Sequence, residues 1–115
     1  MKKEKINILG TEYTILNDVE ETDDTRIKNN LGFTDISVKE IYIAKLYEDK
    51  DGITDLEKIL NKVKRHEIIH AFLYESGING CSNKSGSWAQ NEEMVDWFAI
   101  QSPKIYEIYK KLNIL

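Results

Sequence analysis

The first half of the chain alternates apolar and polar residues with the period of a β-strand. Lys5–Leu9 and Glu12–Asn17 both follow this pattern, and the Gly-Thr pair between them predicts a hairpin turn. Glu40–Leu46 is rich in β-branched and aromatic residues and predicts a third strand. The acidic stretch 18–30 has no clear period, so we expect a loop with one helical turn there.

Apolar residues recur with a helical period after residue 54. Thr54 and Glu57 have the spacing of a capping box, which predicts a helix over Asp55–Ser76. Gly77 follows, and glycine suits the left-handed conformation at which many helices end. The residues that share the inward face of this helix are Leu56, Ile59, Leu60, Val63, His66, His70 and Leu73.

The last third of the chain predicts two further helices after a long loop. Residues 77–90 are rich in Gly, Ser and Asn, and a connection of this length is commonly functional. Asn91 can cap the next helix, whereas Ser102-Pro103 is expected to end it and to begin a last helix that reaches about Leu112. The predicted fold is α+β: one domain over residues 1–115, with a sheet of about three strands packed on a long helix and two C-terminal helices.

Composition limits the possible partners. The net charge is −4, with acidic and basic residues interspersed, so no basic stripe indicates direct binding of nucleic acid. The apolar runs are too short for a membrane span or for the core of a signal peptide. A single cysteine, Cys81, permits no internal disulfide. Together these features predict a cytoplasmic protein without a membrane partner.

Both histidines of the chain belong to one motif, H-E-I-I-H at residues 66–70. Positions i and i+4 lie on one face of a helix, so His66 and His70 can bind one metal ion with Glu67 beside them. Two nitrogen ligands suit Zn²⁺, and a glutamate that is not a ligand can take a proton from water. The motif therefore predicts a zinc hydrolase in which Glu67 is the catalytic base.

A catalytic zinc site needs a third protein ligand, and no histidine remains to provide it. Glu92, in the first turn of the next helix, could point back at the metal if the two helices cross. Glu93 and Cys81 are the alternatives to Glu92. Asp96 lies four residues after Glu92 on the same helix face, where it could accept the outer N–H of a zinc-bound imidazole.

At these residues the chain resembles known zinc peptidases. Asn91-Glu92-x-x-x-Asp96 is similar to the N-E-x-x-x-D that follows H-E-x-x-H in the thermolysin-like peptidases, the gluzincins, which implies that Glu92 is the third ligand and Asp96 a partner of a ligand histidine. No third histidine follows, and Leu73 stands where metzincins have glycine, so the chain is not a metzincin. The stretch H-E-I-I-H-A-F-L-Y-E-S-G … W-A-Q-N-E-E-M-V-D-W-F-A, within Val63–Gln101, more closely resembles the small ImmA/IrrE-type metallopeptidases of phages and integrative elements.

The resemblance implies a minimal zincin-like domain that hydrolyses a peptide bond of an intracellular protein. The lack of an export signal, the small size and the resemblance together favour a helix-turn-helix repressor of a mobile element as the substrate. Two alternatives remain: a non-catalytic, zinc-stabilised protein-interaction module of a phage or integrative element, and an element-encoded interaction protein whose chemistry is vestigial.

Several side chains could contact the substrate. With no spare histidine, a tyrosine is the expected oxyanion donor, and Tyr74, one turn beyond His70, either fills this role or belongs to the core. The strand Glu40–Leu46 could pair with an extended substrate by β-augmentation. We expect Trp88 and Trp97 to anchor the core or the long loop rather than to contact the substrate.

Overall fold

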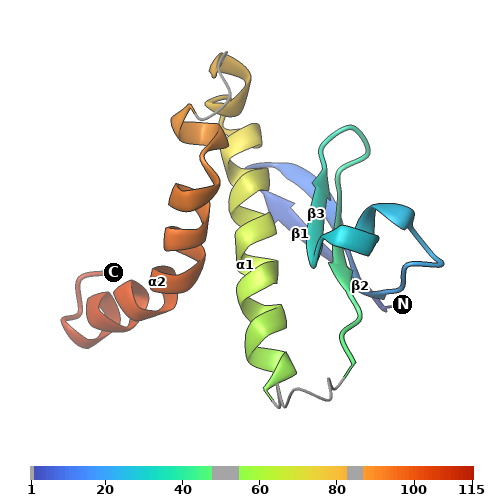
Figure 1. Cartoon of the computed structure of the whole chain (residues 1–115). Helices are drawn as coiled ribbons and strands as arrows, with labels where there is room; N and C mark the ends of the chain where they lie inside the picture. The colour runs from blue at the N-terminus through green and yellow to red at the C-terminus, as the bar shows by residue number, and fades with distance from the viewer. Residues whose placement is uncertain (1, 48–54, 83–86) are drawn as a thin grey trace.

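The structure, a computed structural model that describes residues 2–47, 55–82 and 87–115, is an α+β fold. A long helix, α1 (Leu56–Glu75), lies between a sheet and a second long helix, α2 (Glu92–Lys111), as Figure 1 shows. Three short 3-10 helices, η1 to η3, span Thr25–Asn29, Asn79–Cys81 and Trp88–Gln90. The four strands of the sheet are β1 (Lys2–Ile8), β2 (Thr11–Val19), β3 (Gly32–Asp35) and β4 (Glu40–Ala44).

The sheet is mixed and has the strand order β1-β2-β4-β3. β1 and β2 form the expected antiparallel hairpin, and its turn contains two residues with positive φ, Leu9 at 50° and Gly10 at 95°. Two consecutive positive φ angles are typical of a turn that matches the twist of a hairpin. β2 pairs with β4 in parallel, and β4 pairs with β3 in antiparallel orientation.

The third expected strand, β4, therefore lies inside the sheet, and β3 forms the edge that contacts α1. The prediction that β4 pairs with a substrate is wrong, because both of its edges already carry sheet neighbours. β3 itself has no clear signal in the sequence. It is four residues long, and it contains Gly32 and Asp35, two residue types that are depleted in strands.

The core lies between the sheet and α1. Its fully buried members come from β1, β2 and β4 and from the middle of α1, where Leu60, Val63 and Ile68 also pack against them. A second cluster joins the end of α1 to α2, since Leu73 packs with Ala89 and Val95. α1 is thus packed on two sides, against the sheet and against α2, and not along one inward stripe. The buried residues of the main core are Ile8, Tyr13, Ile15, Ile41, Ile43 and Ala71.

α1 has nearly the expected bounds. Its N-cap is Asp55, whose carboxylate accepts a hydrogen bond from the Lys58 amide at 3.1 Å. Thr54, the expected cap, lies outside the described residues. The helix ends before Ser76, and the next residue, Gly77, has a φ of 87°, which confirms the predicted left-handed end.

α2 differs from the expectation of two helices, because it runs without a break through Pro103. A proline has no N–H to donate to the carbonyl four residues before it, which here is that of Ala99. The Arg65 side chain of α1 donates its Nε–H to this carbonyl at 2.6 Å. A neighbouring helix therefore satisfies the group that Pro103 leaves free, and beyond this point α2 turns away from α1 (Figure 1).

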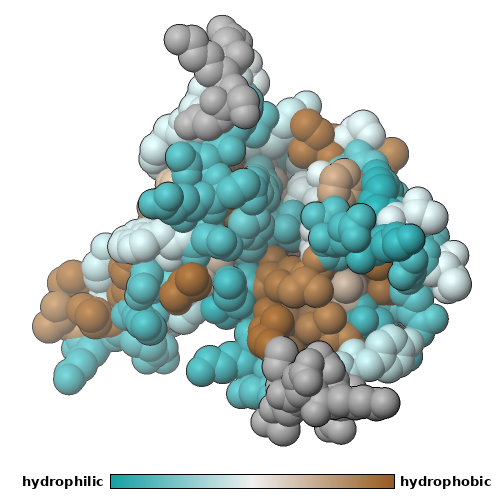
Figure 2. All heavy atoms as spheres, in the orientation of Figure 1, coloured by the Kyte–Doolittle hydropathy of each residue, from teal (hydrophilic) through white to brown (hydrophobic). Residues whose placement is uncertain are grey.

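Hydrophobic side chains gather at the C-terminal end of the chain, where Figure 2 shows them on the surface. The exposed aliphatic residues at this end are Ile108, Leu112, Ile114 and Leu115.

Within residues 2–47, 55–82 and 87–115, no helix combines the length and the apolar character needed to cross a membrane.

Candidate metal centre

The two histidines of the motif lie side by side on α1. Their spacing of four residues places the ring centroids 4.8 Å apart, and the two Nε2 atoms are separated by 3.1 Å. The side chains of His66 and His70 are only 14% and 20% exposed, so both rings are held by their surroundings. Both histidines are thus partly buried on a helix that packs on two sides, rather than along the single inward face that the sequence predicted.

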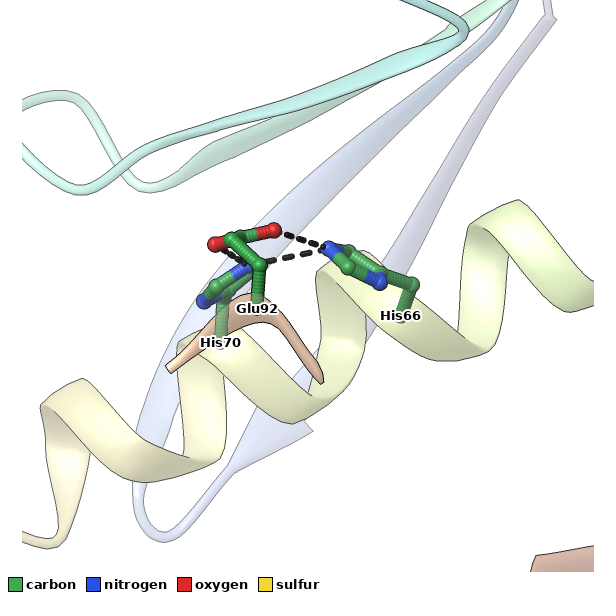
Figure 3. A group of neighbouring side chains, drawn as sticks. All are labelled: His66, His70 and Glu92. Carbon is green, nitrogen blue, oxygen red and sulfur yellow. Dashed lines mark hydrogen bonds and ion pairs between the residues drawn. The ribbon is translucent and has the colours of Figure 1, made fainter. Parts of the chain in front are cut away.

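Glu92, the first residue of α2, brings a carboxylate to the same point. Its Oε2 lies 3.0 Å from His66 Nε2, and its Oε1 lies 3.0 Å from His70 Nε2 (Figure 3). One ligand atom from each of the three side chains lies within 4.8 Å of the others, so together they could hold a metal ion. Among the residues that the structure describes, this group does not include the two alternatives, Glu93 and Cys81.

Helix capping and core packing explain why Glu92, and not Glu93, faces α1. The Asn91 side chain accepts a hydrogen bond from the Met94 amide at 2.9 Å and so starts the helix. Val95, three residues after Glu92 and on the same side of the helix, is fully buried against Leu73. Since successive helical residues differ by about 100°, Glu93 points elsewhere.

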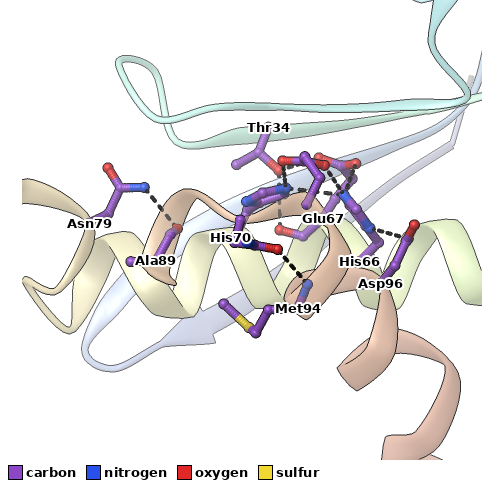
Figure 4. Close-up of polar contacts among 10 residues, drawn as sticks. Thr34, His66, Glu67, His70, Asn79, Ala89, Met94 and Asp96 are labelled. Atoms are coloured by element: carbon purple, nitrogen blue, oxygen red, sulfur yellow. Dashed lines mark hydrogen bonds and ion pairs between the residues drawn. The ribbon is translucent and has the colours of Figure 1, made fainter. Parts of the chain in front are cut away.

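Asp96 forms a hydrogen bond with the ring nitrogen of His66 that does not face Glu92. Its Oδ1 lies 2.8 Å from His66 Nδ1 (Figure 4), and a carboxylate can only accept, so Nδ1 carries the proton. In neutral His66 the Nε2 lone pair then faces the Glu92 carboxylate at 3.0 Å, with two acceptors pointing at each other. A bound cation relieves this repulsion, and two imidazoles with one carboxylate are ligands that Zn²⁺ accepts. The donor set therefore fits a metal.

Glu67 lies beside this cluster but is not part of it. The residue is 7% exposed, and its Oε2 is 3.9 Å from His66 Nε2. Its other oxygen, Oε1, accepts a hydrogen bond from the Thr34 hydroxyl at 2.8 Å (Figure 4). Burial raises the pKa of the Glu67 carboxyl, while the Thr34 hydrogen bond and the two histidines act in the opposite direction.

Thr34 and Gly32 of β3 belong to the candidate site, and the sequence did not reveal them. A Cβ atom on Gly32 would lie 2.7 Å from Val63 Cγ1 and 2.9 Å from Glu67 Cγ, both closer than real Cβ contacts. Glycine is therefore required for β3 to approach α1 at Glu67. Neither residue could be assigned from the sequence, because the sequence of β3 was not recognisable as a strand.

A pocket of about 400 Å³ lies in front of the cluster, between β3 and α1. Glu67, His70 and Tyr74 line it from α1, and Thr34 lines it from β3. A smaller hollow of about 210 Å³ shares His66, Glu67 and Glu92 with this pocket and is also lined by Asp96. The pocket thus follows β3, and the smaller hollow continues past Gly32, the first residue of this strand.

The end of α1 is tied to the sheet by Glu75. Its carboxylate accepts hydrogen bonds from Tyr13 at 2.7 Å, from Lys39 at 2.8 Å and from Thr11 at 3.0 Å. The Lys39 and Tyr13 hydrogen bonds lower the pKa of Glu75. The Lys39 ammonium also lies 4.5 Å from the centroid of the Tyr74 ring. This network fixes the part of α1 that carries Tyr74, which lies half-buried at the pocket wall and not in the core.

Comparison of the chain with models of protein families, with curated proteins and with solved structures yields no match.

Proposed function

We propose that this chain is a zinc-dependent metallopeptidase with a minimal zincin-like fold, and that it hydrolyses a peptide bond of a protein substrate. Two imidazoles and the Glu92 carboxylate converge, while the Glu67 carboxylate remains outside the ligand group, buried, and 3.9 Å from His66 Nε2. Three ligands with a separate base are the requirement of a catalytic zinc site, which keeps one position open for water or substrate. This separation of roles carries the proposal.

Zn²⁺ held by His66, His70 and Glu92 would polarise the scissile carbonyl and make a water molecule more acidic. The protein's own part in the proton transfer belongs to Glu67, which takes the proton of the attacking water and passes it to the leaving amine. The Thr34 hydroxyl holds Oε1 of this carboxylate, which leaves Oε2 directed at the cluster. The raised pKa supports this role, because a less acidic carboxyl is a stronger base once it is ionised.

Tyr74 is the proposed donor to the oxyanion that forms at the substrate carbonyl. It lines the same pocket as Glu67 and His70, and Lys39 stacks on its ring. Replacing Tyr74 by Phe removes only the hydroxyl, so we expect a fall in kcat of about 10²-fold without loss of metal. An unchanged kcat would remove Tyr74 from the reaction.

An extended substrate would pair with the edge strand β3. The pocket follows β3, and the smaller hollow continues past Gly32 at the start of this strand, which supports cleavage within a chain rather than removal of a terminal residue. As the natural substrate we propose a helix-turn-helix repressor of a mobile element, on the strength of the sequence resemblance. Incubation of the zinc-loaded protein with such a repressor and with unfolded casein tests this, and cleavage of casein alone would point to a general peptidase.

The test of the activity combines elemental analysis with hydrolysis. We expect one zinc ion per wild-type chain, and loss of zinc in His66→Ala, His70→Ala and Glu92→Ala. Glu93→Ala is the matched control and should keep its zinc, because Glu93 lies outside the cluster. If Glu93→Ala loses zinc and Glu92→Ala does not, the third ligand is Glu93.

Glu67→Gln separates binding from catalysis. This variant should bind zinc and fold normally but fail to hydrolyse substrate, since an amide cannot take a proton from water. Stoichiometric zinc in the wild type without any hydrolysis would instead identify a zinc-stabilised interaction module. Hydrolysis by Glu67→Gln at the wild-type rate would show that another residue is the base.

A further inference from the structure

Both tryptophans of the chain lie on the outer side of α2 and of the preceding 3-10 helix η3. Trp88 is 56% exposed and Trp97 is 52% exposed, so neither anchors the core or the loop as the sequence suggested. Together with Met94 and Ile100 they line a pocket of about 680 Å³. Large aromatic side chains gathered at an exposed concave surface are typical of an interaction site.

Two carboxylates give this tryptophan pocket a charge preference. Glu93 and Asp96 line it together with the four apolar residues and Asn91, and among the residues that the structure describes no Lys or Arg lines it. A lysine or arginine of a partner could pair with either carboxylate and lie over an indole ring, which is the aromatic surface that attracts cations most strongly. An acidic segment, in contrast, would be repelled.

We propose that the tryptophan pocket binds a segment of another protein in which a basic residue neighbours an apolar one. The apolar side chain enters between the two tryptophans, and the basic side chain contacts Glu93. The pocket does not include His66, His70 or Glu92, so this binding does not depend on the metal or on the proposed peptidase activity.

Asp96 connects the tryptophan pocket to the candidate metal centre. It lines this pocket and also the smaller hollow beside the cluster, and its Oδ1 accepts from His66 Nδ1. A segment bound here would lie next to Asp96, which contacts His66 of the candidate metal cluster. If the partner is also the substrate, the pocket would hold it beside the site of cleavage.

Intrinsic fluorescence tests the proposal directly, because both tryptophans of the chain line this one pocket. The probe is a short, blocked, tryptophan-free peptide in which leucine alternates with lysine, and its counterpart carries glutamate in place of lysine. Both are titrated into the full chain in the presence of EDTA. We expect a saturable blue shift with the lysine peptide, and at least tenfold weaker binding of the glutamate peptide.

Variants locate the binding. Glu93→Lys and Trp97→Ala should each weaken binding of the lysine peptide at least tenfold, with Trp88 as the remaining reporter in the second variant. Tyr106→Ala removes an equally exposed aromatic residue of the same helix and should have no effect. An unchanged emission, or equal binding of both peptides, would overturn the proposal. Sedimentation that shows a dimer dissociated by Trp97→Ala would assign the pocket to a second copy of the chain instead.

Discussion

Gly32→Ala tests the close approach of β3 to α1, the helix that carries the two histidines. The added methyl group would lie 2.7 Å from Val63 Cγ1 and 2.9 Å from Glu67 Cγ. The first distance is about 0.7 Å short of ordinary contact between carbon atoms, and the second about 0.5 Å short. Both neighbours are side chains held in a packed interior, so β3 and α1 must move apart or the side chains must leave their preferred rotamers.

Over-packing of this kind costs about 1–3 kcal/mol of the free energy of unfolding. For a chain of this length that corresponds to a fall in Tm of about 4 °C for each kcal/mol. Thermal unfolding followed by circular dichroism in EDTA measures the loss without a contribution from bound metal. The separation also displaces Glu67, so hydrolysis should fall even at temperatures where the variant remains folded.

Gly80→Ala is the matched control. Among the residues that the structure describes, a Cβ atom at Gly80 would meet nothing within 4 Å, so the same substitution should leave Tm unchanged or raise it slightly. Combining Gly32→Ala with Val63→Ala removes the closer of the two contacts, and the double variant should lose less than the sum of the single losses. A Gly32→Ala variant that unfolds at the wild-type temperature would refute the described packing of β3 on α1.

Three further predictions concern hydrogen-bonded side chains near the cluster and at the end of α1. Thr34→Val keeps the side-chain shape but removes the hydrogen bond to Glu67. The rate of hydrolysis should therefore fall by about tenfold or more with unchanged zinc content. Thr34→Ser keeps the hydroxyl and should retain activity. Asp96→Ala should lower zinc affinity or activity by about 10–100-fold, because His66 loses the group that fixes its tautomer. Zinc affinity is measured by competition with a chelator, and a variant with wild-type affinity and wild-type turnover would contradict this prediction. The pKa of Glu75 is lower in the folded state than its ordinary value of 4.5, so the Glu75 carboxylate stabilises the fold above pH 4.5. This stabilisation is lost as the pH falls through the lower pKa of the folded state. Glu75→Gln should therefore flatten the acid side of a plot of Tm against pH.

The cluster is the part of the molecule that the sequence predicts best. Spacing of four residues determines that His66 and His70 share a helix face. The Asn91 cap determines where α2 begins, and hence that Glu92 is its first residue. These are local effects of helix geometry and capping, which depend on residues a few positions apart. The hairpin of β1 and β2 is local in the same sense, and its alternation was also visible in the sequence.

The elements that complete the site depend on contacts between distant parts of the chain. β3 is a strand because it pairs with β4 and packs on α1, not because of its composition, and so Thr34 and Gly32 could not be assigned beforehand. α2 continues through Pro103 because Arg65, far away in the sequence, donates to the carbonyl that the proline leaves free. Local spacing therefore determined which side chains form the candidate metal cluster, whereas long-range packing decided which strand lies beside them. Hydrogen bonds and steric fit between separate elements are not encoded in the periodicity of either element.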